Sequence, residues 1–147
     1  MINIKSGNIL NCTENIICHQ VNVQGVMGGG LARQLADRYP DLENAYSEYC
    51  RIHNNRYIDL SADVLFYVTE NKVIANMFSQ KENFDTDYLN MEIALTYLKK
   101  FAQENDLSIA IPRNIGNGIA NGINGMAEKI IRKVFKDSLI NVTMYEL

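Results

Sequence analysis

The sequence contains few cysteines and histidines, and this scarcity limits the metal and disulfide chemistry available to the chain. Its 147 residues include three cysteines, Cys12, Cys18 and Cys50, and two histidines. The cysteines are odd in number and form no C-x-x-C pair, so the sequence does not offer the four ligands of a structural zinc site. We therefore expect no metal site and no cofactor, and thiols that stay reduced in the cytoplasm.

The sequence also lacks long apolar runs and any excess of basic residues. No apolar run approaches the ~20 residues of a membrane span, and the N-terminal segment MINIKSGNIL has no apolar stretch like that of a signal peptide. A net charge of -3 argues against broad electrostatic binding to nucleic acid, whereas backbone N–H groups can still hold a small anion. We expect a soluble, monomeric, cytoplasmic protein with a small-molecule ligand.

The length of 147 residues fits one domain, which we place at residues 1–147. Alternation and apolar runs predict strands at Ile2–Lys5, Asn15–Val21, Asp63–Glu70, Lys72–Gln80, Ser108–Pro112 and in the closing INVTMYEL. Helical spacing and stop signals predict helices at about Gly29–Arg38, from an Asp41 cap to Ile52, at Thr86–Asn105 and at about Met126–Phe135. Because the third and fourth strands form a hairpin and strands otherwise alternate with helices, the pattern predicts an α/β domain with a mixed sheet.

The segment from Thr86 to Asn105 carries the clearest helical pattern. One apolar stripe repeats at intervals of four, with two further apolar residues beside it: Leu89, Ile93, Tyr97 and Phe101, then Ala94 and Leu98. Such a stripe is typical of the buried face of an amphipathic helix. We therefore expect these side chains to pack on the sheet.

Two glycine-rich segments each follow a predicted buried strand and precede a predicted helix. They are Gly25–Gly30 and Gly116–Gly125. Glycine lets the backbone approach a ligand closely, and a helix start offers unpaired N–H groups, so the two segments favour a phosphate site at the carboxyl ends of the strands. The alternative is that both are only tight turns. The glycine spacing fits no dinucleotide fingerprint, and the sequence has no G-K-[ST] of a P-loop.

The chain resembles the macrodomain family in three segments: KSGNIL at 5–10, CHQVNVQGVMGGGLARQLADRYP at 18–40 and IPRNIGNGIANG at 111–122. The most specific of them is the glycine segment, with the A-x-Q and Y-P that follow it. Within the family, the chain is similar to the ADP-ribose-1''-phosphate phosphatase-like macrodomains of phage, bacteria and yeast. The resemblance covers essentially the whole chain. It implies a three-layer α/β/α sandwich with a mixed central sheet, and ADP-ribose or a derivative as the ligand.

The resemblance also implies which residues contact ADP-ribose. Asn8 stands where many macrodomains have an aspartate that contacts adenine, and Asn22 matches an asparagine that bonds the distal ribose. An amide oxygen can replace the carboxylate at Asn8, although without its charge. The implied ligand-binding residues are Gly7, Asn8, Ile9, Asn22, Gly28, Gly29, Gly30, Leu31, Ile115, Gly116, Asn117, Gly118 and Ile119.

Two departures from the family pattern bear on the reaction. Relatives that remove ADP-ribose from glutamate or DNA use a lysine after the strand that here ends MFSQ, where this chain has Gln80 followed by Lys81. They also use an aspartate in the second glycine segment, where this chain has Ala120. The resemblance therefore argues against a lysine-based covalent mechanism and leaves Gln80 as a candidate catalytic residue.

His19 is the other candidate catalytic residue. The resemblance matches it to a histidine implicated in catalysis in the yeast-type phosphatases, and an imidazole can act as nucleophile or general base near neutral pH. We hypothesise that His19 attacks the terminal phosphate or activates a water for that attack, while loop N–H groups stabilise the developing charge. The alternative is a buried strand histidine that is bonded to a neighbouring carbonyl.

The function that the sequence favours is hydrolysis of ADP-ribose-1''-phosphate to ADP-ribose and phosphate. A second reading is a non-catalytic module that binds ADP-ribose or an ADP-ribosylated partner. A third is an ADP-ribosyl hydrolase that acts on modified protein or nucleic acid, which the residues at positions 80 and 120 disfavour. We expect ADP-ribose or its 1''-phosphate as the binding partner, with no membrane and no nucleic acid.

Overall fold

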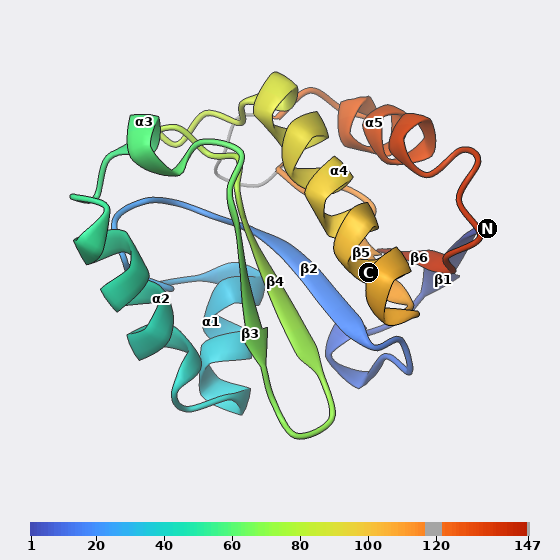
Figure 1. Cartoon of the computed structure of the whole chain (residues 1–147), viewed down its shortest axis with the longest axis horizontal. Helices are drawn as coiled ribbons and strands as arrows, with labels where there is room; N and C mark the ends of the chain where they lie inside the picture. The colour runs from blue at the N-terminus through green and yellow to red at the C-terminus, as the bar shows by residue number, and fades with distance from the viewer. Residues whose placement is uncertain (117–121, 147) are drawn as a thin grey trace.

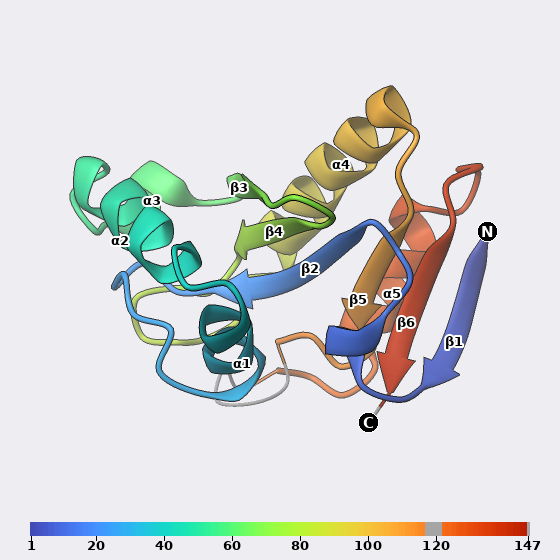
Figure 2. The ribbon, with the colours of Figure 1, turned by 90° about the horizontal axis from the view of Figure 1, so that it is seen from below.

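The computed structural model describes residues 1–116 and 122–146, and a mixed six-stranded sheet lies at the centre of this part of the chain (Figures 1 and 2). The strands are β1 (Ile2–Ser6), β2 (Ile16–Val21), β3 (Val64–Val68), β4 (Val73–Phe78), β5 (Ile109–Pro112) and β6 (Val142–Glu146). Their order in the sheet is β1–β6–β5–β2–β4–β3. Only the β3–β4 pair is antiparallel among these strands, which confirms the predicted hairpin and mixed sheet.

Helices cover both faces of the sheet and complete the predicted α/β/α sandwich (Figures 1 and 2). One face carries the 3-10 turn η1 (Ile9–Asn11) and the helices α1 (Gly30–Arg38), α2 (Leu42–Ile52) and α3 (Tyr57–Leu60). The other face carries α4 (Tyr88–Asn105) and α5 (Met126–Val134). No helix within the described residues is long and apolar enough to cross a bilayer.

Side chains of β2 alternate between the two hydrophobic cores. Cys18 packs in the core under α4 and α5, whereas Ile17 and Val21 pack in the core under α1 and α2. Successive side chains of a strand point to opposite faces of its sheet. The strand therefore directs His19 toward the α1 side and Gln20 toward the α4 side.

The connection after β2 and the connections after its neighbours β4 and β5 lie on opposite faces of the sheet. After β2 it enters α1 and α2 on one face, whereas after β4 and β5 it enters α4 and α5 on the other. Neighbouring strands whose connections diverge in this way leave a crevice at their carboxyl ends, where α/β proteins bind ligands. The ends of β2, β4 and β5 are therefore the part of the fold where a site is expected.

Helix α4 buries a different face from the one that its four-residue repeat predicts. Leu89 is 74% exposed, and Ile93 and Tyr97 are also exposed, so the predicted stripe was wrong for these three residues. Phe101 packs against the core from a partly buried position. The fully buried side chains are Met91, Ala94, Leu95, Leu98 and Ala102.

The helix caps also differ in part from the prediction. The side chain of Asp41 makes no capping hydrogen bond, and α2 begins at Leu42. Asp87 instead caps α4, because its side chain accepts a hydrogen bond from the backbone N–H of Asn90 at 3.2 Å. Such a cap satisfies one of the N–H groups that a helix start leaves unpaired.

Truncation of a side chain should affect stability strongly on the buried face of α4 and weakly on its exposed face. Leu95→Ala should lower the free energy of unfolding by about 2–5 kcal/mol, because it opens a cavity in the core. Leu89→Ala, six residues earlier on the exposed face, should change it by less than about 0.5 kcal/mol. Urea unfolding of both variants measures the difference. Equal losses would contradict the packing described here.

Candidate functional site

A cavity of about 690 Å³ opens at the carboxyl ends of β2 and β5, beside the start of α1. This volume lies within the usual range of small-molecule sites. The walls come from the end of β2, the loop that leads to α1, and the segments that follow β4 and β5. The lining residues within the described part of the chain are 19–22, 24, 26–32, 46, 80, 112, 115 and 116.

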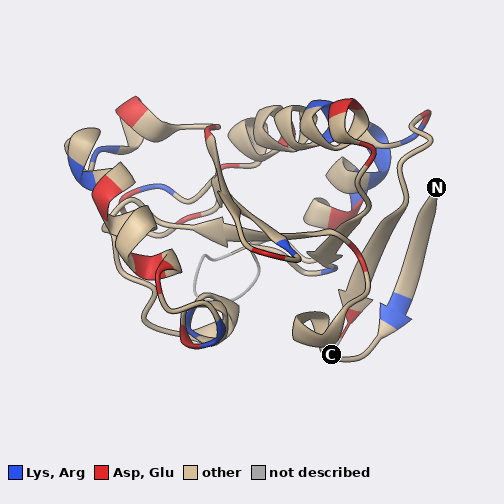
Figure 3. Cartoon of the chain, turned by 60° about the horizontal axis from the view of Figure 1, so that its bottom comes forward, with Lys and Arg blue, Asp and Glu red and all other residues tan. Residues whose placement is uncertain are grey.

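The cavity wall is polar in places but carries no Lys, Arg, Asp or Glu among its described residues. Figure 3 shows basic and acidic residues interspersed over the helices and connecting segments. In the described ranges no three His, Cys, Asp or Glu residues are grouped so that they could hold a metal ion. An anion in this cavity therefore has to be held by backbone N–H groups and side-chain amides.

His19 and Asn76 form a buried pair across β2 and β4. The two residues are direct neighbours in the strand register, and the imidazole Nε2 lies 2.7 Å from Asn76 Oδ1. The amide nitrogen of Asn76 donates to the carbonyl oxygens of Leu65, at 2.9 Å, and Ile74, at 3.3 Å. Because those contacts fix the amide orientation, Oδ1 must accept, and Nε2 of His19 carries the proton.

This tautomer leaves a lone pair on Nδ1 of His19. The side chain is only 2% exposed and lines the cavity. Among the described residues, Nδ1 is the buried side-chain nitrogen or oxygen atom that has no hydrogen-bond partner. A buried polar atom without a partner costs free energy, so a ligand hydroxyl or water that donates to Nδ1 would recover part of that cost.

Burial also keeps the imidazole uncharged. It lowers the pKa of His19 from its usual 6.5 to about 4, and the hydrogen bond with Asn76 opposes part of this shift. The side chain is therefore neutral near pH 7, with Nδ1 available as an acceptor. The alternative of a histidine bonded to a neighbouring carbonyl holds in part, because Nε2 bonds the Asn76 amide, but Nδ1 is left over.

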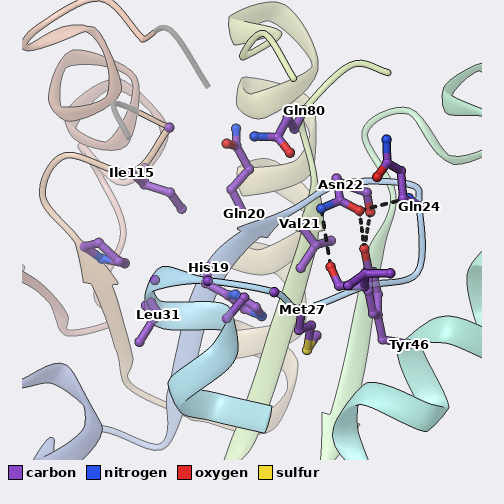
Figure 4. Close-up of a pocket in the computed structure, with 17 residues that line it drawn as sticks. His19, Gln20, Val21, Asn22, Gln24, Met27, Leu31, Tyr46, Gln80 and Ile115 are labelled. Atoms are coloured by element: carbon purple, nitrogen blue, oxygen red, sulfur yellow. Dashed lines mark hydrogen bonds between the residues drawn. The ribbon is translucent and has the colours of Figure 1, made fainter. Parts of the chain in front are cut away.

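Two glutamines supply amides near the end of β2, and Gln20 lies on the α4 side of this strand, opposite to His19. Gln20 Nε2 donates to the Ser79 hydroxyl at 2.9 Å and to the Thr86 hydroxyl at 3.3 Å. Gln80 follows β4, is buried and lines the cavity. Figure 4 shows the amides of Gln20 and Gln80 near each other, with His19 on the opposite side of the strand.

The register after β4 separates Gln80 from Lys81. Gln80 forms an isolated antiparallel bridge with Thr86 and lies in the cavity wall. Lys81 is exposed and lies outside the lining, with its backbone N–H bonded to the carbonyl of Asp85. Within the described cavity lining, position 80 therefore carries a neutral amide and no lysine is present.

The first glycine segment forms the cavity wall next to α1. Gly28, Gly29, Gly30 and Leu31 all line the cavity, together with Asn22 at the end of β2. Gly29 is the N-cap residue of α1, so no side chain caps the first turn. The backbone N–H groups of this first turn and the positive end of the helix dipole can therefore face a ligand.

The second glycine segment contributes Gly116 to the wall, and Ile115 directly before it also lines the cavity. Gly116 has a φ of +84°, and a Cβ there would lie 2.8 Å from the Thr86 hydroxyl oxygen, so this position requires glycine. Thr86 also donates to the Gly116 carbonyl at 2.9 Å. The predicted ligand residues Asn117, Gly118 and Ile119, and the departure at Ala120, lie outside the described residues.

The predicted ligand residues Gly7, Asn8 and Ile9 are not among the residues that line the cavity. Gly7 follows β1, and its N–H donates to the Glu146 carbonyl at 3.0 Å. The side-chain oxygen of Asn8 caps η1 by accepting from the Leu10 N–H at 3.0 Å, and Ile9 is buried in the core under α1 and α2. Their contact with a ligand stays a prediction.

Sequence reasoning missed three residues that shape the site. Asn76 sets the tautomer of His19, Gln20 lines the cavity, and Tyr46 of α2 donates to Asn22. Gln20 could have been noticed as a polar residue in an apolar strand. Asn76 carries the same signal in KVIANMF, where an amide interrupts a buried run.

The lowered pKa of His19 predicts a specific pH dependence of stability. Between about pH 6.5 and pH 4 the unfolded imidazole binds a proton and the folded one does not, so the free energy of unfolding falls as the pH falls. The loss amounts to on the order of 3 kcal/mol. His19→Gln lacks this component, so its urea stability should fall less than that of the wild type over this range. Parallel curves would contradict the buried neutral imidazole.

No family model matches the chain, but its sequence is similar to enzymes that act on ADP-ribose derivatives. It is 29% identical to the ADP-ribose 1''-phosphate phosphatase of Saccharomyces cerevisiae over 119 aligned residues, which cover 76% of this chain and 67% of the yeast protein. It is 39% identical to the DNA ADP-ribosyl glycohydrolase of Mycobacterium tuberculosis over 51 residues. That match covers 35% of this chain and only 14% of the mycobacterial protein.

Solved structures match the whole fold. The macrodomain of Mycobacterium tuberculosis DarG has a TM-score of 0.88 at 23% identity, over 100% of this chain and 98% of that one. A macrodomain protein from Streptomyces coelicolor has a TM-score of 0.83 at 26% identity, over 100% and 99%. Thermosipho africanus DarTG in complex with ADP-ribose has a TM-score of 0.82 at 16% identity, over 97% and 41%. The matches show that this chain has the macrodomain fold, and its sequence resembles that of the ADP-ribose 1''-phosphate phosphatases.

Proposed function

We propose that the chain binds ADP-ribose in the cavity beside β2 and hydrolyses ADP-ribose 1''-phosphate to ADP-ribose and phosphate. The observation that carries this proposal concerns His19: its side chain lines a cavity of ligand size, and its buried Nδ1 has no hydrogen-bond partner among the described residues. The similarity to the yeast phosphatase and to a fold solved with ADP-ribose supports the choice of ligand.

The rest of the cavity suits a phosphorylated ribose. Its described lining has no carboxylate to repel an anion, and α1 begins there with an uncapped first turn. Backbone N–H groups at a helix start bind phosphate without any side-chain charge. Amides of Asn22 and Gln80 lie in the same wall and can donate to ligand oxygens.

In the proposed reaction His19 acts as the general base. Nδ1 takes a proton from a water whose oxygen attacks the phosphorus, and the bond between phosphorus and the ribose oxygen breaks. The leaving oxygen then takes the proton back from His19, so the products are ADP-ribose and phosphate. A bound dianionic phosphate stabilises the protonated imidazole and raises its pKa from the low value of the empty site.

The cavity favours this reaction over glycohydrolysis through a lysine. Position 80 is a glutamine in the wall, and Lys81 is exposed outside it. A neutral amide can orient a ligand but cannot form a covalent bond to the ribose in the way that an amine does. We therefore assign Gln80 a ligand-orienting role at the site. The second candidate function is a non-catalytic module that binds ADP-ribose.

Phosphorus NMR with ADP-ribose 1''-phosphate tests the proposal. The wild type should convert the substrate to ADP-ribose and free phosphate, and His19→Ala should lower the rate about 10²–10⁴-fold, as expected for loss of a general base. His53→Ala is the matched control and should retain the rate. His53 lies at the end of α2, outside the cavity lining.

Each other outcome of this experiment identifies a different error. Turnover that is unchanged in His19→Ala removes His19 from the mechanism. Substrate that binds the wild type without turnover makes the chain a reader. A parallel assay with ADP-ribosylated DNA covers the remaining case: release of ADP-ribose there, with no phosphate release from ADP-ribose 1''-phosphate, would move the chain to the glycohydrolase class.

A further inference from the structure

The loop that follows β2 presents alternate residues to opposite sides. Val23, Gly25 and Met27 are buried, and between them Gln24, Val26 and Gly28 are exposed. The three exposed residues line the cavity, and the buried Met27 lines it as well. The loop therefore turns Gln24, Val26 and Gly28 toward the cavity and Val23 and Gly25 toward the protein interior.

The buried side of this loop is held mainly by one face of α2. Glu43 accepts a hydrogen bond from the Met27 N–H at 2.8 Å, and the Ser47 hydroxyl donates to the Gly25 carbonyl. Residues 43, 46 and 47 share a face because side chains three and four positions apart are neighbours on a helix. This spacing places Tyr46 between the two anchors, directly under the end of β2.

Tyr46 fixes the orientation of the Asn22 side chain. Its hydroxyl lies 2.8 Å from Asn22 Oδ1 and 2.6 Å from the Asn22 carbonyl oxygen. The Gln24 N–H donates to the same Oδ1 at 2.8 Å, so that atom must be the amide oxygen. Figure 4 shows this oxygen turned toward Tyr46 and the amide nitrogen turned away from it.

The amide nitrogen of Asn22 is left for a ligand. Among the described residues it makes one long contact, 3.4 Å to the Val26 carbonyl, and Asn22 lines the cavity. An amide nitrogen carries two hydrogens. Burial raises the pKa of Tyr46, so its hydroxyl stays protonated, and its one hydrogen is shared between the two Asn22 oxygens.

We propose that Tyr46 is a positioning residue, which holds Asn22 so that its N–H groups face a hydroxyl of the ribose in the cavity. The proposal rests on the function proposed above, because it takes ADP-ribose as the ligand. Without the Tyr46 hydroxyl, Asn22 Oδ1 keeps only the Gln24 N–H, and the side chain gains rotational freedom. Ligand binding must then order it, which lowers affinity.

Calorimetry with ADP-ribose on Tyr46→Phe tests this role. The variant keeps the ring that stacks against Phe78, with centroids 6.1 Å apart, and removes one hydroxyl. Its Kd should rise about tenfold, in line with loss of one buried hydrogen bond. Tyr49→Phe is the matched control, because Tyr49 lies on α2 beside the same Phe78 but donates to Asp63, away from the cavity. Its Kd should stay within about twofold.

A double-mutant cycle with Asn22→Ala separates positioning from general loosening. If Tyr46 acts through Asn22, Tyr46→Phe should weaken ADP-ribose binding by less than about twofold once the side chain of residue 22 is gone. An equal tenfold loss in both backgrounds would overturn the proposal, as would a Kd for Tyr46→Phe that matches the wild type. Failure of the wild type itself to bind ADP-ribose would instead overturn the proposed function.

Discussion

The hydrogen bond between His19 and Asn76 is the contact on which the chemistry of this site depends. It exists because the parallel register of β2 and β4 sets the two residues side by side on the face under α1. The fixed orientation of the Asn76 amide gives His19 its Nε2–H tautomer. Burial keeps the imidazole neutral, and its Nδ1 has no hydrogen-bond partner among the described residues.

The remainder of the site supplies shape and backbone dipoles rather than charge. Connections that leave β2 and β5 toward opposite faces open the crevice, and α1 starts in it without a side-chain cap. The loop that precedes α1 is anchored from behind by α2. Such preorganised donors are effective toward an anion because they need little rearrangement when it binds.

Much of this arrangement could be predicted from the sequence, because glycine segments after buried strands are local signals. They predicted the two loops that meet at Gly28–Gly30 and Gly116, and the strand pattern predicted the mixed sheet. The contacts that orient the site could not be predicted in the same way. Tyr46 meets Asn22 across 24 positions, and His19 meets Asn76 across 57.

Two other features show why local patterns were insufficient. The repeat of large side chains on α4 predicted burial of Leu89, but the helix packs on the sheet through a face that carries Ala102 as well as the predicted Ala94. Small residues let a helix approach closely, and hydrophobic size alone does not reveal that choice. The position of Gln80 depended on strand register, because a shift of one residue moves a side chain to the other face.

Nitrogen-15 NMR of the histidine side chains tests the central claim most directly. The chain has two histidines, so His19→Gln assigns both sets of signals. The account predicts that at neutral pH His19 has a protonated Nε2 and an unprotonated Nδ1, and that the Nδ1 signal shifts when ADP-ribose is added. A protonated Nδ1 in the free protein, or an Nδ1 signal that saturating ADP-ribose leaves unchanged, would contradict it.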